Sequence, residues 1–187
     1  MNFCSSCGAA VILKVPDGDH LPRFVCTRCE TIHYQNPKIV AGCIVEWQEK
    51  ILLCRRAIEP RHGTWTLPAG FMENGETTME AAARETQEEA CAPVVDLKLY
   101  CMYSLPHINQ VYIMFRGNSP AGEAAAGPES LEVAFVGEND IPWDEIAFPV
   151  IKETLEDYVK DRRRKAFPTH VGDILRLPDR SIRIVRY

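Results

Sequence analysis

Three glutamates, Glu85, Glu88 and Glu89, follow one another at i, i+3 and i+4 in the segment RETQEEA. On a helix this spacing places the three carboxylates side by side, where like charges repel. They would also lie in the last turns of the helix, where its dipole disfavours anions. A divalent cation such as Mg²⁺ removes this cost, because it prefers carboxylate oxygens and retains waters for substrate phosphates. The alternative is a solvated acidic face, which is common on surface helices.

Four cysteines near the N-terminus have the spacing of a zinc site. Cys4 and Cys7 form one Cys-x2-Cys pair, and Cys26 and Cys29 form a second pair after 18 intervening residues. Four thiolates fill a tetrahedral Zn²⁺ shell and leave no position for a catalytic water, so the predicted role of the metal is structural. So short a segment buries too little apolar surface to fold alone, and zinc would supply the missing folding free energy.

Composition places the chain among ordinary globular proteins. It has 187 residues, of which 46% are apolar and 25% charged, enough for one main domain and a small appendage. The formal net charge of -5 gives no indication of a nucleic-acid partner. No apolar run approaches the roughly 20 residues that cross a bilayer, and the N-terminus lacks a signal-peptide pattern. We therefore expect a cytoplasmic protein without a membrane partner, whose thiols stay reduced.

Apolar periodicity and turn residues indicate the elements that must position these side chains. Strands are predicted at 39–46, 51–55, 95–104, 109–116 and 131–136. Thr77 and Glu80 form a capping-box pattern that begins a helix over 78–90, and Pro149 begins a second helix over 149–164.

The first helix should pack on a sheet through one apolar arc. Its predicted members are Met79, Ala82, Ala83, Thr86 and Ala90. Four cysteines outside the N-terminal pairs are expected to be small buried hydrophobes: Cys43, Cys54, Cys91 and Cys101. We predict a zinc ribbon over 1–35, a main domain over 36–167 and a hairpin-like tail over 168–187.

The stretch GFMENGETTMEAAARETQEEACA, residues 70–92, resembles the Nudix box, G-x5-E-x7-R-E-U-x-E-E-x-G-U. Six residues fall on its fixed positions: Gly70, Glu76, Arg84, Glu85, Glu88 and Glu89. Cys91 stands where the family has glycine, and Thr86 and Ala92 are weak hydrophobes at apolar positions. Because glycine suits a left-handed helix exit, we expect the loop after this helix to differ.

The resemblance implies an α+β fold, in which a Nudix α/β/α sandwich follows the zinc ribbon. It implies hydrolysis of a nucleoside diphosphate derivative with catalytic Mg²⁺ or Mn²⁺, beside structural Zn²⁺. Glu85, Glu88, Glu89 and the Gly70 carbonyl match metal ligands, and Glu76 and Arg84 match positions that shape the loop. The general base is left open among four residues, Glu88, Glu89, Glu129 and Glu132, and of the last two we select Glu132 as a catalytic candidate.

Segments beyond the box, such as YQNPK, GPESLE and IPWDEIAF, resemble the plant and bacterial FAD/ADP-ribose pyrophosphatase group. This implies that the chain converts FAD to FMN and AMP, or ADP-ribose to AMP and ribose 5-phosphate. One alternative is an NADH pyrophosphatase, although the S-Q-P-W-P-F-P-x-S segment of those enzymes is absent. A non-catalytic nucleotide- or RNA-binding module and a nucleoside-triphosphate hydrolase are the others. Relatives are often homodimers, so a homodimer is a further expectation.

Candidate substrate-binding residues precede or follow the box. Arg55, Arg56 and Arg61 could contact phosphate, and Arg56 is the one we select. Aromatic side chains could stack on adenine, although each is also suited to an ordinary core position: Trp65, Phe71, Tyr103 and Tyr112.

Overall fold

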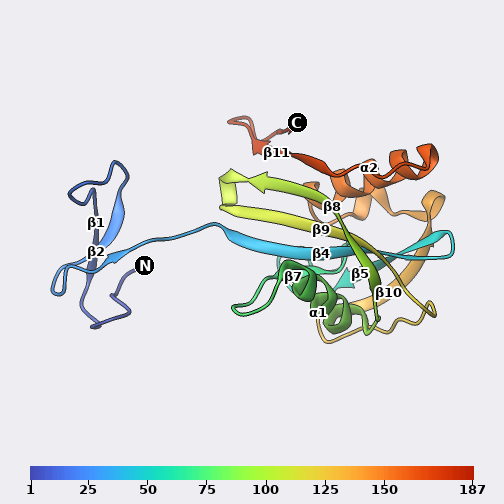
Figure 1. The fold of residues 1–187 in the computed structure, drawn as a ribbon, viewed down its shortest axis with the longest axis horizontal. Coiled ribbons are helices and arrows are strands. Elements are labelled where there is room, and N and C mark those ends of the chain that lie inside the picture. Colours follow the sequence, from blue (N-terminus) through green and yellow to red (C-terminus); the bar gives the residue numbers. More distant parts are fainter. The chain divides into compact units, whose positions relative to one another are not determined.

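The computed structural model describes residues 1–187, which form two compact units, Met1–Pro37 and Lys38–Tyr187 (Figure 1). The first unit contains β1 (Val11–Lys14), β2 (Arg23–Cys26) and β3 (Ile32–His33). The second contains β4 (Lys38–Trp47), β5 (Lys50–Arg56), β6 (Trp65–Thr66), β7 (Ala69–Phe71), α1 (Thr78–Ala90), β8 (Val95–Leu105), η1 (Pro106–Ile108), β9 (Gln110–Asn118), β10 (Ser130–Gly137), η2 (Glu138–Asp140), η3 (Trp143–Glu145), α2 (Pro149–Arg164), β11 (His170–Arg176) and β12 (Ile182–Arg186). Neither α-helix has the length and apolar character required to cross a membrane.

The first unit is a small antiparallel sheet in the order β1-β2-β3. Its turns bring together the two cysteine pairs that lie far apart in the sequence. The four Sγ atoms all lie within 4.8 Å of one another.

The second unit is built on a nine-stranded mixed sheet in the order β10-β5-β4-β9-β8-β11-β12, with β6 beside β5 and β7 beside β4. β4 runs parallel to β9, and β11 runs parallel to β8. β8 and β9 form an antiparallel pair, so the first residues of β9 lie beside the last residues of β8. The same edge of the sheet therefore holds the starts of β4 and β9 and the ends of β8 and β11. Residues far apart in the sequence therefore meet at this edge.

The two helices cover opposite faces of this sheet, as Figure 1 shows. Along β4, Val40 and Ile44 belong to the apolar cluster that includes α2. Ala41, Cys43 and Val45 belong to the cluster that includes α1. Successive strand residues point to opposite faces, so this alternation buries both faces of the strand. The Nudix α/β/α arrangement is thereby confirmed.

Helix α1 begins at the predicted capping box. Glu80 N–H donates to the Thr77 hydroxyl at 3.2 Å, and Thr77 N–H donates to the Glu80 carboxylate at 2.7 Å. The predicted apolar arc was partly wrong, because Met79 is 45% exposed while Ala81 is fully buried. Apart from Glu89, the buried side chains of the helix are the small Ala81, Ala82, Thr86 and Ala90. Small side chains let α1 lie close to the sheet.

Cys91 ends α1 in the left-handed conformation, with φ of 45°, although it is not glycine. Its N–H donates to the carbonyl of Gln87 at 3.0 Å. Cys91 is exposed, so the expectation that it is buried was wrong; Cys43, Cys54 and Cys101 are buried as expected. Its neighbours Ala90 and Ala92 are fully buried in the cluster between α1 and the sheet, so the exposure is local to Cys91.

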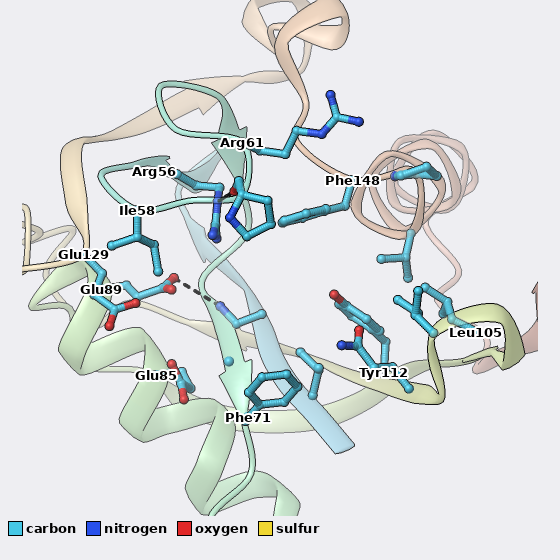
Figure 2. A pocket seen from close by; sticks show the side chains of 18 of the residues that line it. Arg56, Ile58, Arg61, Phe71, Glu85, Glu89, Leu105, Tyr112, Glu129 and Phe148 are labelled. Carbon is cyan, nitrogen blue, oxygen red and sulfur yellow. Dashed lines mark hydrogen bonds between the residues drawn. The ribbon is translucent and has the colours of Figure 1, made fainter. Parts of the chain in front are cut away.

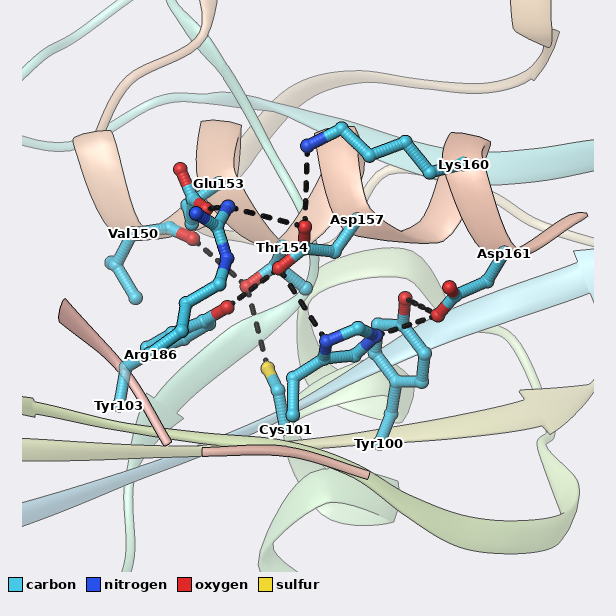
Figure 3. Close-up of polar contacts among 11 residues, drawn as sticks. Tyr100, Cys101, Tyr103, Val150, Glu153, Thr154, Asp157, Lys160, Asp161 and Arg186 are labelled. Atoms are coloured by element: carbon cyan, nitrogen blue, oxygen red, sulfur yellow. Dashed lines mark hydrogen bonds and ion pairs between the residues drawn. The ribbon is translucent and has the colours of Figure 1, made fainter. Parts of the chain in front are cut away.

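Helix α2 binds the sheet through buried carboxylates, which Figure 3 shows. Asp161 accepts hydrogen bonds from the hydroxyl of Tyr100 at 2.8 Å and from the ring of His170, whose Nε2 lies 2.6 Å away. Asp157 accepts from the hydroxyl of Tyr103 at 2.7 Å. Buried polar groups are stable only when paired, so these bonds fix α2 on β8 and on the first residue of β11.

The β11–β12 hairpin continues the main sheet. Its last strand is held by Arg186, which bonds Glu153 and lies 3.3 Å from Asp157 (Figure 3). The residues predicted as a tail thus share the core of Lys38–Tyr187, with Ile174 fully buried.

Candidate functional site

A cavity of about 1130 Å³ opens at the sheet edge where β4 and β9 begin and β8 and β11 end. Tyr112 and Leu105 line it from β9 and β8. Figure 2 shows Glu85, Glu89 and Glu129 together on one side, with Tyr112 and Leu105 on the other. The cavity therefore has an acidic wall built by α1 and an aromatic and aliphatic wall built by the sheet.

The carboxylate of Glu85 lies against the backbone of β7. A Cβ atom added to Gly70 would overlap both carboxylate oxygens of Glu85, so a side chain at residue 70 would displace this carboxylate. Burial raises the pKa of Glu85, and the charges of Glu88 and Glu129 raise it further, while Arg84 opposes the shift. Gly70 and Glu85 are thus adjacent in space although 14 residues separate them in the sequence.

Glu89 is the most buried member of the acidic wall, with 7% of its surface exposed. Its carboxylate accepts a hydrogen bond from the Ala69 amide at 3.2 Å, the dashed line in Figure 2. Burial raises the pKa of Glu89 to about 8, Glu85 and Glu129 contribute in the same direction, and Arg56 opposes them. No cationic side chain forms an ion pair with Glu89. A negative charge here is costly unless a cation arrives.

Arg84 forms hydrogen bonds with three glutamates of this region. Its Nε and Nη2 donate to the two carboxylate oxygens of Glu76 at 3.0 and 2.8 Å. Its Nη1 donates to Glu85 at 2.8 Å and to Glu88 at 3.0 Å. A planar guanidinium can make this fork of bonds, which a lysine ammonium cannot reproduce. The Arg84 bond lowers the pKa of Glu76 to about 2, with help from the Glu73 amide.

The loop between β9 and β10 closes the end of α1. Gly127 N–H donates to the carbonyl of Glu89 at 3.0 Å, and Ala125 N–H donates to the carbonyl of Ala90 at 2.9 Å. A Cβ atom at Gly127 would overlap the carbonyl oxygen of Glu88. This contact brings Glu129 to the cavity and satisfies carbonyls that a helix end leaves free. Sequence reasoning missed this contact between the loop and the helix. The only signal for it was the run of small residues AGEAAAGP.

Known proteins share both units of this structure. The family model described as NUDIX domain matches residues 36–158, and the one described as Nudix N-terminal matches residues 2–35. An ADP-ribose pyrophosphatase from Methanocaldococcus jannaschii is 34% identical over 133 residues, which cover 68% of this chain and 76% of that protein. The chain belongs to the Nudix hydrolase family.

Solved structures and longer relatives agree with this assignment. A NUDIX hydrolase from Nitrosomonas europaea superposes on this Nudix hydrolase with a TM-score of 0.90 and 55% identity, covering 94% of this chain and 99% of that one. An NAD-capped RNA hydrolase NudC from Photobacterium profundum is 31% identical over 71% of this chain. The chain spans 48% of that NudC and 60% of a NudC from Salmonella heidelberg.

Three of the four predicted substrate-binding residues of this Nudix hydrolase line the cavity: Arg56, Phe71 and Tyr112. The Arg56 guanidinium lies 5.1 Å from the centre of the Phe148 ring, and Lys38 Nζ lies 4.6 Å from the centre of the Phe71 ring. Tyr112 is 9% exposed. Phe71 is 47% exposed, so its ring is open to a ligand.

Other candidates lie away from the cavity. Trp65 packs against the core on the α2 side of the sheet and does not line the cavity. Tyr103 is fully buried and bonded to Asp157. Glu132 lies 3.6 Å from Arg55 on the neighbouring strand and also lies outside the cavity, whereas Glu129 lines it. Sequence reasoning selected Glu132 of these two glutamates, whereas Glu129 is the one that lies at the cavity.

The cysteine cluster of the zinc ribbon has the dimensions of a tetrahedral site. Zn–S bonds of about 2.3 Å would separate the sulfurs by about 3.8 Å. The Sγ atoms of Cys4 and Cys29 lie 3.7 Å apart, and those of Cys7 and Cys26 lie 3.4 Å apart. A hydrogen bond with the Thr31 hydroxyl lowers the pKa of the Cys29 thiol to about 6, which favours the thiolate that zinc requires. The four residues fit structural zinc.

The acidic wall fits a hard cation by its donor chemistry. Glu85 and Glu89 present oxygens in a region where burial raises the pKa of both, and Glu129 adds a third carboxylate. Arg84 compensates Glu85 but does not reach Glu89. Oxygen-only donors of this kind suit Mg²⁺ or Mn²⁺.

Proposed function

We propose that this Nudix hydrolase cleaves the pyrophosphate bond of a nucleoside diphosphate joined to another moiety, with ADP-ribose as the first substrate to test. The products would be AMP and ribose 5-phosphate. The observation that carries this proposal is a cavity with a cluster of carboxylates on one wall, among them the buried and unpaired Glu89, together with Arg56, Phe71 and Tyr112. The ADP-ribose pyrophosphatase relative supports the choice of substrate.

Glu85, Glu88 and Glu89, with the Gly70 carbonyl, would hold Mg²⁺ or Mn²⁺. When bound, the metal supplies charge neutralisation of the diphosphate and a water of lowered pKa. Arg84 orients Glu85 and Glu88, and Glu76 in turn fixes Arg84 through two bonds. The chain's own contribution is thus a set of carboxylate oxygens that Arg84 and Glu76 hold in place before a ligand binds.

Arg56 and Glu129 would act on the substrate from positions beside Glu89 (Figure 2). Arg56 lines the cavity close enough to Glu89 to lower its pKa, so it lies within reach of a diphosphate bound there. Glu129 is our candidate for the general base, because it lines the cavity and Glu132 does not. A base must lie within about 3 Å of the attacking water or one water away from it.

The size of the cavity favours FAD as a second candidate. Its volume of about 1130 Å³ exceeds the range of roughly 300–1,000 Å³ that holds drug-sized ligands. The NudC relatives add NADH and NAD-capped RNA as test substrates, since their names refer to capped RNA. All of these contain a pyrophosphate linked to adenosine.

The test is a substrate panel with Mg²⁺: ADP-ribose, FAD, NADH, CoA and a short NAD-capped RNA, each followed by product release. We expect ADP-ribose or FAD to give the highest kcat/KM. Glu89→Gln should reduce kcat by about 100-fold or more, because it removes an oxygen anion aimed at the metal. Glu123→Gln is the matched control, since Glu123 is exposed and lies outside the cavity. Tight binding without turnover on any substrate would instead indicate a nucleotide-binding module.

A further inference from the structure

The C-terminal hairpin forms one wall of the cavity. Four of its residues line the space, Ile174 and Arg176 from β11, Arg180 from the connecting turn and Ile182 from β12. The NUDIX domain match ends at residue 158, so the hairpin lies outside the matched region. The hairpin thus contributes two arginines to the cavity from outside the matched domain.

Neither Arg176 nor Arg180 has a charged partner within the protein. Their side chains form no ion pair or hydrogen bond, and both are exposed. Arg186 on the same hairpin contrasts with them, because it bonds Glu153 and lies near Asp157. The hairpin is therefore anchored by one arginine and presents two others to the cavity.

The backbone of the turn carries Arg180 in an uncommon conformation. Its φ is 69°, in the left-handed region that favours glycine. Arg180 N–H donates to the carbonyl of Leu177 at 2.9 Å, and Leu177 N–H donates to the carbonyl of Ser181 at 2.9 Å. Glycine is the usual residue at such a hairpin position. An arginine here costs conformational energy that glycine would not.

The hairpin lies across the cavity from the acidic wall. Helix α1 packs beside β4 and β7, and two strands, β9 and β8, lie between β4 and β11. At about 4.8 Å per strand, β11 lies roughly 14 Å from β4 along the sheet. An anion at Arg176 and Arg180 is therefore a different group from a diphosphate held at Glu85 and Glu89.

We propose that Arg176 and Arg180 form a second anion subsite, which binds a phosphate monoester on a ribose of the substrate, at the 2′ or the 3′ position. The preferred substrate would then carry this phosphate in addition to the pyrophosphate that is cleaved. The placement of that pyrophosphate rests on the proposed function. Two unpaired guanidinium groups suit the charge and the oxygens of a phosphate monoester.

The experiment compares substrates that differ only by this phosphate. ADP-ribose is paired with ADP-ribose 2′-phosphate, and 3′-dephospho-CoA is paired with CoA. We expect wild type to favour the phosphorylated member of at least one pair by about tenfold in kcat/KM, or about 1.4 kcal/mol, shared between two exposed charge contacts. The preference should disappear in Arg176→Gln/Arg180→Gln and persist in Arg183→Gln, a hairpin arginine outside the cavity.

Binding without turnover separates this inference from the proposed function. Calorimetry compares AMP with adenosine 2′,5′-bisphosphate and adenosine 3′,5′-bisphosphate on the same proteins. If a bisphosphate binds about tenfold more tightly than AMP in wild type but not in the double variant, the subsite stands even when no substrate is cleaved. The proposed subsite is overturned if wild type shows the same kcat/KM and the same affinity for both members of every pair. It is also overturned if the preference for the phosphorylated member survives in the double variant.

The variant Arg180→Gly separates a role of Arg180 in substrate binding from a role in the fold. Glycine relieves the left-handed conformation at φ of 69°, so this variant should melt at a higher temperature than wild type while it loses the preference for the phosphorylated substrate. A variant that melts earlier with the preference intact would assign Arg180 to the fold alone.

Discussion

The carboxylate of Glu85 on α1 rests against the Cα atom of Gly70 on β7, with no room for a Cβ atom between them. The strand and the helix therefore meet at a point where only glycine is compatible with the position of the acid. We expect Gly70→Ala to displace Glu85 and to lower kcat about 100-fold, since a shift of about 1 Å at a catalytic group has that effect. Steady-state kinetics with ADP-ribose and Mg²⁺ would measure it.

Circular dichroism separates this effect from a loss of fold in Gly70→Ala. The matched control is Ala69→Gly, which changes the neighbouring side chain by one methyl group and leaves Glu85 its space. Wild-type kcat in a folded Gly70→Ala protein would show that Glu85 need not keep this position.

Glu76 should make stability depend on pH in the acid range. The Arg84 bond holds its pKa at about 2, below the ordinary value of 4.5, so folding favours the ionised form. This contribution is fully present above pH 4.5 and is lost as the pH falls towards 2. We expect Glu76→Gln to lower the Tm at pH 7 and the gap from wild type to shrink progressively below pH 4.5. A gap that stays constant down to pH 2.5 would contradict the ion pair; Glu123→Gln serves as the control.

Asp161 should be a major contributor to the stability of the second unit. Asp161→Ala leaves the hydroxyl of Tyr100 and the ring of His170 without their buried partner. Unpaired buried polar groups cost about 1–3 kcal/mol each, so we expect the free energy of unfolding to fall by about 3 kcal/mol. Urea unfolding measures it, with Lys152→Ala, an exposed α2 residue outside the network, as the control that changes it by less than about 1 kcal/mol. Equal losses in the two variants would refute the role of the network.

The zinc ribbon should lose its fold with its metal. We expect Cys26→Ser to abolish bound zinc and to expose residues 1–37 to proteolysis, because a unit this small depends on the metal for its stability. Elemental analysis and limited proteolysis with mass spectrometry would follow both. Cys91→Ser, at an exposed cysteine outside the cluster, should keep its zinc. A protease-resistant ribbon in Cys26→Ser would show that the apolar core alone suffices.

Local patterns in the sequence predicted the elements that carry the site. The capping box at Thr77 and Glu80 fixed the start of α1, because both of its hydrogen bonds form within four residues. The spacing of Glu85, Glu88 and Glu89 placed them on the helix correctly, since helical geometry is local. The sequence predicted only part of the helix face that packs on the sheet. Met79 was assigned to this face wrongly, because its exposure depends on which strands lie beneath the helix.

The sequence by itself determined the two units' chemistry: four thiols with zinc spacing and a box of acids on one helix. Only the tertiary structure decided that Glu89 is buried while Glu88 is exposed, and that Glu129, rather than Glu132, reaches the cavity. It also brought the arginines of the distant hairpin to the same space. The physical reason is that the burial of a side chain depends on the residues that pack against it. Here those residues come from strands and loops that are distant in the sequence.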